Sequence, residues 1–165
     1  IATGRPRSEA EYPLKHFRLG QFFPVVLTLD DCVRKEKRII EQEGKAVSLS
    51  KPDPFMLDAI AEGYRNAVKE LFYIGDMPDD MLAAARSRFN FKSIGILISA
   101  ADKSSLKKNL LRAGADDIIE DFESLKKMAI KLGLKINFRG FVDNKSSEFR
   151  ELLETSLIFV FTSET

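Results

Sequence analysis

The chain has 165 residues, of which 44% are hydrophobic and 31% are charged, and its formal net charge is +1. This composition fits one globular domain with enough apolar residues for a core. The balanced charge argues against a nucleic-acid binder with a basic face and against a membrane-surface protein. No apolar run in the sequence reaches the ~18 residues that a membrane-spanning helix needs. Cys32 is the only cysteine, which excludes an internal disulfide and favours a reducing, cytoplasmic setting.

The first residues, Ile1 and Ala2, are typical of the end of a strand. The loop after them leads into a predicted helix over about residues 7–19, which Pro13 must kink or break. A β-branched run over residues 25–29 predicts a short strand. The acidic pair Asp30 and Asp31 lies at the end of that predicted strand.

A charged helix is predicted over residues 33–44, and its charge run is best explained as a solvated face. The sequence Lys-Pro-Asp-Pro at residues 51–54 comes next. After it, apolar residues at helical spacing predict a helix over residues 55–68. This helix leads directly into the next strand.

The segment from Leu71 to Ala85 organises the rest of the chain. An apolar run stops at Gly75, and Asp76, Asp79 and Asp80 follow before an Ala-rich helix begins. This pattern predicts a buried parallel strand that presents carboxylates at its C-terminal end, where ligands bind in open α/β sheets. Clustered carboxylates suit Mg²⁺. Capping of the following helix explains the same aspartates equally well.

The remaining elements alternate regularly as far as residue 132. Strands are predicted over 93–98 and 116–119, and helices over 104–112 and 121–132. Alternating strands and helices imply a parallel sheet with right-handed crossovers. The predicted fold is therefore α/β, a three-layer α/β/α sandwich with a mainly parallel Rossmann-like sheet.

Two units are expected along the sequence. Residues 1–134 form the predicted core domain, and residues 135–165 form an extension whose place in the sheet is open. In the extension, strands are predicted over 138–142 and 157–161 around a helix over 146–153. The apolar end of this extension could also serve a partner, and a homodimer is one such assembly.

Three stretches converge at one edge of the predicted sheet. A hydroxyl and backbone amides at Thr3 and Gly4 can cradle an anion, Lys51 can neutralise a phosphate, and Asp76 with Asp80 can hold a divalent cation that bridges it. Together they indicate phosphoryl-transfer chemistry. Taken singly, Thr3 can be a helix cap and Lys51 an exposed loop lysine.

Four motifs carry a family resemblance. The chain resembles the haloacid dehalogenase superfamily of phosphohydrolases, and most closely its capped, phosphoglycolate phosphatase-like subfamily. The resemblance covers about residues 1–132. The matching stretches are ATGRPR at residues 2–7, FFPVVLTLDD at 22–31, KPDP at 51–54 and YIGDMPDDMLAAARS at 73–87.

The resemblance implies roles for the residues of the second and third motifs. Thr3 would bind the substrate phosphate through its hydroxyl, with the backbone of Gly4 beside it. Arg5 would touch the phosphate or the rest of the substrate. Lys51 would steady the phosphate and the nucleophile. The implied substrate is a small phosphorylated metabolite, selected by a cap that this chain does not contain.

The fourth motif implies a magnesium site. Asp76 would bind Mg²⁺ directly, and Asp80 would bind it directly or through water. Asp79 matches a shorter spacing used elsewhere in the superfamily and is the reserve ligand.

The superfamily's first motif, a strand that ends in two aspartates one residue apart, has no counterpart in this chain. Asp30 and Asp31 are adjacent to each other and match a non-catalytic acidic turn. These residues alone therefore cannot supply the carboxylate that attacks the phosphate. The expected explanation is a fragment of a longer protein whose first motif and cap lie upstream, and residues 34–43 are expected to be an insertion.

Three functions follow from this reading. The first is a magnesium-dependent phosphomonoester hydrolase that acts through an aspartyl-phosphate. The second is a catalytically inactive relative that keeps the anion and metal pocket as a binding scaffold. A receiver-like signalling module, suggested by residues 112–122, is disfavoured because its acidic cluster and phosphorylatable Asp have no correctly placed counterparts.

Overall fold

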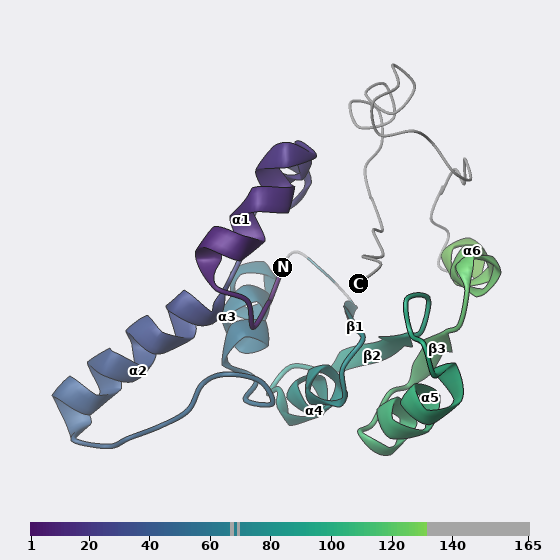
Figure 1. Cartoon of the computed structure of the whole chain (residues 1–165). Coiled ribbons are helices and arrows are strands. Elements are labelled where there is room, and N and C mark those ends of the chain that lie inside the picture. Colours follow the sequence, from purple (N-terminus) through teal and green to yellow (C-terminus); the bar gives the residue numbers. More distant parts are fainter. Residues whose placement is uncertain (67, 69, 132–165) are drawn as a thin grey trace.

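A computed structural model describes residues 1–66, 68 and 70–131 (Figure 1). Helices and strands alternate in its second half, as the sequence predicts. The elements are α1 (Arg7–His16), the 3₁₀ helix η1 (Leu19–Phe22), α2 (Leu29–Glu43), α3 (Phe55–Tyr64), β1 (Leu71–Gly75), α4 (Pro78–Arg86), β2 (Phe91–Ile96), α5 (Lys103–Arg112), β3 (Asp117–Ile119) and α6 (Phe122–Lys131).

The three strands form a parallel sheet in the order β1-β2-β3, with Leu71 beside Phe91 and Ile94 beside Asp117. Because the strands are parallel, their C-terminal ends share one edge of the sheet. Helices flank the sheet on both faces, as described below, so the predicted α/β class is confirmed.

Two clusters of buried residues show how the helices are divided between the faces. On one face, Met81 of α4 and Leu110 of α5 pack with Leu97. On the other face, Leu125 of α6 packs against Ile94 and Ile119. Consecutive residues point to opposite faces: Leu97, directly after β2, joins the first cluster, while Ile94 and Ile119 belong to the second. This arrangement produces the three layers.

The strand β1 is parallel, as predicted, but it is not buried. Phe72 is 36% exposed and Ile74 is 49% exposed. Among the described residues β1 pairs only with β2, and α6 lies over β3 rather than over β1 (Figure 1). The apolar run in the sequence predicts burial on both faces, but among the described residues the face of β1 toward α4 is the covered one, and Phe72 and Ile74 on the other face are exposed.

The predicted strand over residues 25–29 is wrong in extent. Its backbone lies parallel to the start of the chain, with a bridge between Ala2 and Leu27, but helix α2 already begins at Leu29. The reason is that Thr28 and Asp31 close a capping box at the start of α2. The helix cap overrides the β-propensity of the preceding valines.

The first helix is shorter than the predicted 7–19. Helix α1 keeps Pro13 inside it and ends at His16, and Arg18 adopts a left-handed conformation (φ 54°) before η1. The missing N–H of Pro13 weakens the last turns, which explains the early end. His16 is exposed and stacks on Tyr12.

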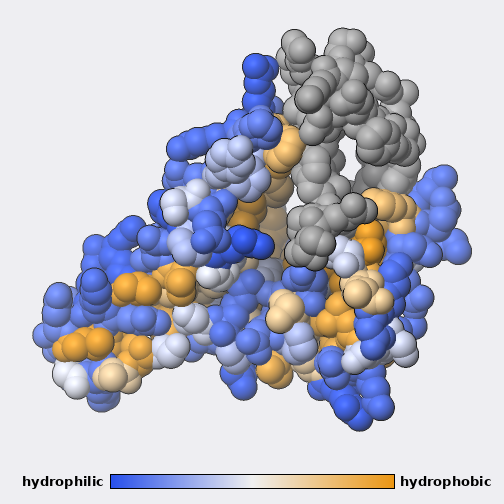
Figure 2. Space-filling model, viewed as in Figure 1, coloured by the Kyte–Doolittle hydropathy of each residue, from blue (hydrophilic) through white to orange (hydrophobic). Residues whose placement is uncertain are grey.

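The charged helix of the first half is confirmed as α2, which begins four residues before the predicted 33–44 and ends at Glu43, capped by Gly44 with φ 67°. It projects from the body of the molecule (Figure 1), and in the space-filling view the region it occupies mixes hydrophilic with hydrophobic residues (Figure 2); Val33 and Ile40 are the exposed apolar side chains of this helix. Its exposure agrees with the prediction of a solvated face. Cys32, in its first turn, is completely buried.

The predicted elements over 138–142, 146–153 and 157–161 lie outside the described residues, and the domain boundary at residue 134 stays a prediction. Within the part of the chain that the structure describes, no helix has the length and apolar character needed to cross a bilayer.

Candidate functional site

A largely buried ion pair lies at the C-terminal end of β1. The Nζ atom of Lys51 donates to Oδ1 of Asp80 over 2.6 Å, and the two side chains are 17% and 6% exposed. Lys51 comes from the loop before α3, and Asp80 from the first turn of α4. The structure therefore brings together two of the residues that the sequence predicts for the site, although they are 29 positions apart.

Asp80 has a second function as a helix cap. Its Oδ2 accepts a hydrogen bond from the backbone N–H of Met77 over 3.1 Å, which satisfies a donor at the start of α4. The capping explanation of the acidic cluster is thus correct for Asp80. Capping and ion pairing use different oxygens of the same carboxylate.

Tyr73 of β1 joins this pair to the start of the chain. Its hydroxyl lies 3.0 Å from Oδ1 of Asp80 and 3.4 Å from the carbonyl oxygen of Ala2. Burial, together with the negative charge of Asp80, raises the pKa of Tyr73 far above its ordinary value, so the hydroxyl keeps its proton. Lys51 Nζ lies 5.6 Å from the centre of the same ring.

Gly75 is required for this arrangement. A Cβ atom at this position would lie 2.4 Å from Cβ of Asp80 and 2.5 Å from its Oδ2. The strand can deliver the chain to α4 with Asp80 turned back under it only because residue 75 has no side chain. The glycine that ends the apolar run is thus explained by close packing.

The loop of Thr3, Gly4 and Arg5 lies next to Ala2, one residue beyond the contact with Tyr73. The Oγ1 atom of Thr3 accepts from the N–H of Arg5 over 3.2 Å, which makes a local turn. The side chain of Arg5 is 70% exposed and pairs with Glu9. No contact among the described residues links Arg5 to Lys51 or Asp80.

Asp76 and Asp79 differ from Asp80, because both are exposed and their side chains make no hydrogen bond or ion pair within the described residues. In that part of the chain, no group of three or more His, Cys, Asp or Glu residues is arranged to hold a metal ion. A magnesium ion that keeps most of its waters needs only one or two carboxylates. Asp76 meets that need at the strand end, whereas the oxygens of Asp80 are already engaged.

Tyr73 is the residue of this cluster that sequence reasoning missed. It stands in the apolar run Leu71 to Ile74, where it is interpreted as one more strand residue. A buried tyrosine needs a partner for its hydroxyl. Its spacing along the sequence gives no signal for the contact with Asp80, which lies seven positions further on.

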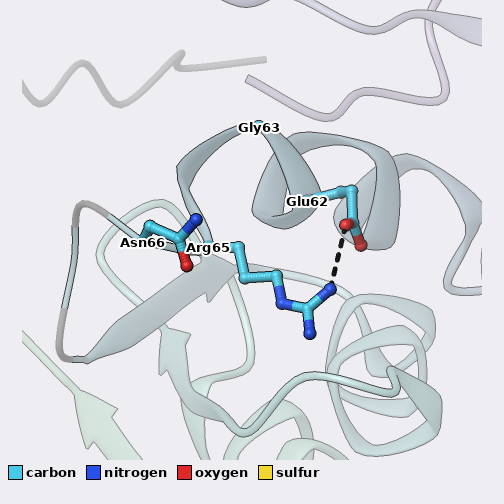
Figure 3. Close-up of a pocket in the computed structure, with 4 residues that line it drawn as sticks. All are labelled: Glu62, Gly63, Arg65 and Asn66. Atoms are coloured by element: carbon cyan, nitrogen blue, oxygen red, sulfur yellow. Dashed lines mark hydrogen bonds and ion pairs between the residues drawn. The ribbon is translucent and has the colours of Figure 1, made fainter.

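An open pocket lies elsewhere, at the C-terminal end of α3 (Figure 3). It is lined by Glu62, Gly63, Arg65 and Asn66, and Arg65 pairs with Glu62 over 3.5 Å. Lys51 precedes the opposite end of that helix. The pocket includes none of the residues predicted for the site.

The fold and the cluster together define an α/β protein with a lysine and carboxylates at the C-terminal end of a parallel strand. Comparison with protein families gives a match to the family described as haloacid dehalogenase-like hydrolase over residues 1–96. The chain belongs to this family. Comparisons with curated proteins and with solved structures give no match.

Proposed function

We propose that this chain is part of a magnesium-dependent phosphomonoester hydrolase that acts through an aspartyl-phosphate on a small phosphorylated metabolite. The observation that carries the proposal is the buried Lys51–Asp80 pair, tied through Tyr73 to the backbone beside Thr3. A largely buried lysine is suited to an anion, and the loop of Thr3 to Arg5, linked to it through Tyr73 and Asp80, offers a hydroxyl and backbone N–H groups. Family membership supports hydrolysis as the reaction class.

Each residue has a role in the proposed reaction. Lys51 contacts Asp80 over 2.6 Å and can use its remaining protons to hold a phosphate. The hydroxyl of Thr3 can donate to a phosphate oxygen, because its contact with Arg5 uses it as an acceptor. The N–H of Gly4 is the neighbouring donor in the proposal.

Asp76 is the proposed magnesium ligand, with Asp79 as the reserve and Asp80 acting through water. Bound Mg²⁺ would neutralise charge that develops on the phosphate. Because Lys51 already neutralises Asp80, the charges left for a metal near the strand end are those of Asp76 and Asp79.

The attacking carboxylate is the missing part. The 165 residues contain no pair of aspartates separated by one residue, and a covalent mechanism needs a positioned nucleophile. We assign it to a segment outside these residues in a longer protein. The same observation favours the second candidate, an inactive scaffold that binds phosphate without hydrolysing it.

Hydrolysis of p-nitrophenyl phosphate by that longer protein separates the two candidates. The enzyme is expected to turn over with Mg²⁺ and to stop when the metal is chelated. Asp76→Asn should lower kcat at least about 100-fold without loss of fold, as judged by circular dichroism. The matched control is Asp117→Asn, which changes an exposed aspartate of β3 and should leave kcat unchanged.

Undiminished kcat in Asp76→Asn would remove Asp76 from the site. Absence of any turnover, combined with binding of inorganic phosphate, would support the scaffold. Absence of both would overturn the phosphate site itself.

A further inference from the structure

The hydroxyl of Tyr73 is the only described side-chain group that contacts both Asp80 and the backbone of residues 1–3. Both of its neighbours, a carboxylate oxygen and a carbonyl oxygen, are acceptors, so the hydroxyl shares its single proton between them. Oδ1 of Asp80 at 3.0 Å is the main acceptor, and the carbonyl oxygen of Ala2 at 3.4 Å is the weaker one. It therefore joins the end of β1, the first turn of α4 and the start of the chain. The start of the chain is 71 positions from Tyr73, whereas Asp80 is seven positions away.

We infer that Tyr73 is a positioning residue, whose hydroxyl fixes Asp80 and the Ala2 carbonyl so that Lys51 and the Thr3 loop face one phosphate. The inference rests on the proposed function, because Lys51 and Thr3 are its phosphate ligands. Tyr73 itself touches neither the substrate nor the metal in this scheme.

Asp80 shows why a third donor matters. Oδ1 accepts from both Lys51 and Tyr73, while Oδ2 accepts from the N–H of Met77. Without the hydroxyl, Lys51 is left as the only described partner of Oδ1. The carboxylate then holds the ammonium more tightly, and less of its charge is available to a phosphate.

Loss of the contact with Ala2 is also expected to weaken phosphate binding. Thr3 follows Ala2 directly, and its N–H is fixed to the carbonyl of Leu27 over 2.9 Å on the other side. Ala2 also packs against the apolar cluster of Leu57, Ala83 and Ala84, and the Tyr73 hydroxyl adds the hydrogen bond that ties this segment to Asp80 and hence to Lys51. Loss of the hydroxyl therefore loosens the Thr3 loop relative to Lys51, and geometric misplacement weakens ligand binding.

The variant Tyr73→Phe isolates the hydroxyl. It keeps the ring, its packing against Phe91 and its contact with Lys51. Binding of inorganic phosphate to the 165-residue chain, measured by calorimetry with MgCl₂ present, is expected to weaken about tenfold. The matched control is Tyr64→Phe, which removes a hydroxyl that has no partner among the described residues and should leave the affinity unchanged.

A purely structural role of Tyr73 is tested by Ile119→Val, which changes a fully buried side chain of β3 outside the site. This variant should lower the melting temperature and keep the phosphate affinity. If Ile119→Val weakens phosphate binding as much as Tyr73→Phe does, or if Tyr73→Phe binds as well as the wild type, the positioning role is overturned.

A crystal structure of Tyr73→Phe separates this inference from the proposed function. Failure of the wild-type chain to bind phosphate would overturn the proposed function. In that case the crystal structure still decides whether Tyr73 positions the cluster. The expected result is displacement of Asp80 or of the Ala2 backbone, and an unchanged arrangement of both would overturn the inference.

Discussion

The chain contains two acidic turns that are built alike, one at the start of α2 and one at the start of α4. In each turn the third helical residue reaches back to the backbone: Asp31 accepts from the N–H of Thr28 over 2.9 Å, and Asp80 from the N–H of Met77 over 3.1 Å. Each also pairs over 2.6 Å with a cation from a distant segment, Arg7 for Asp31 and Lys51 for Asp80. Local capping is therefore the same in both.

The two turns differ in whether their other carboxylates have partners among the described residues. In the first, Asp30 is also engaged, because its Oδ2 accepts from the N–H of Arg7 over 2.7 Å at the start of α1. In the second, Asp76 and Asp79 have exposed side chains without partners in the described residues. The first turn uses its carboxylates to hold two helices together. The second keeps carboxylates that a ligand can use.

The cations differ as well. Lys51 is 17% exposed, whereas Arg7 is 38% exposed. A buried pair loses more when one partner is removed, because the remaining charge has no water to compensate it. An acidic turn is therefore a candidate site when its cation is buried and some of its carboxylates are unpaired.

Gly75→Ala is expected to have the largest effect, because it breaks the second turn only. The new Cβ would lie 2.4 Å from Asp80, so the first turn of α4 must move. We expect a loss of about 3 kcal/mol or more in the free energy of unfolding, measured by urea denaturation. The control Gly63→Ala meets no atom within 4 Å inside helix α3. It should stabilise by up to about 1 kcal/mol, and equal effects of the two variants would contradict the packing around Gly75.

Asp80→Asn is expected to have the next largest effect. It leaves Lys51 without its counter-charge while the side-chain shape is kept. We expect the free energy of unfolding to fall by about 2 kcal/mol. This is less than the roughly 3–5 kcal/mol lost when one partner of a fully buried pair is removed, because Lys51 retains some access to water. Asp79→Asn, one residue away and unpaired, should stay within about 0.5 kcal/mol. If both variants have the same stability, Asp80 does not hold the buried pair.

The sequence predicted the alternation of strands and helices from Leu71 to Lys131, because each element there has its own apolar period and its own stop signal. It was less accurate at residues 25–29, where the capping box of Thr28 and Asp31 outweighs strand propensity. It also predicted a buried β1, because an apolar run does not show which neighbours cover it. The local sequence of a strand does not show whether distant segments will cover its two faces.

The sequence named Lys51 and Asp80 as site residues, and the structure brings them together as an ion pair that was not itself predicted. The roles of Asp76 as a metal ligand and of Thr3 as a phosphate ligand stay predictions. The contact of Tyr73 with Ala2 could not be predicted, because it joins residues 71 positions apart through one hydroxyl. The engagement of Asp30 with α1 was missed for the same reason. Long-range polar contacts depend on the packed structure rather than on spacing.

The smallest effect concerns the first turn and depends on pH. Burial alone would raise the pKa of Asp31, but the N–H and hydroxyl of Thr28 and the guanidinium groups of Arg7 and Arg34 outweigh it, so the pKa lies below its ordinary value. The unfolded chain then binds a proton more readily than the folded one. The contribution of Asp31 is therefore complete above about pH 5 and is lost as the pH falls through the lowered pKa.

Asp31→Asn is accordingly expected to lower the free energy of unfolding by about 1 kcal/mol at pH 7. The loss is small because Arg7 and Arg34 remain accessible to water. The difference from the wild type should shrink toward zero by about pH 2, as measured by urea denaturation across the pH range. Glu41→Gln removes an exposed carboxylate of the same helix and should change stability by no more than about 0.5 kcal/mol at any pH. A pH-independent difference for Asp31→Asn would show that its side chain acts through shape rather than charge. The first turn would then be a neutral cap, and the likeness between the two acidic turns would be limited to their backbone hydrogen bonds.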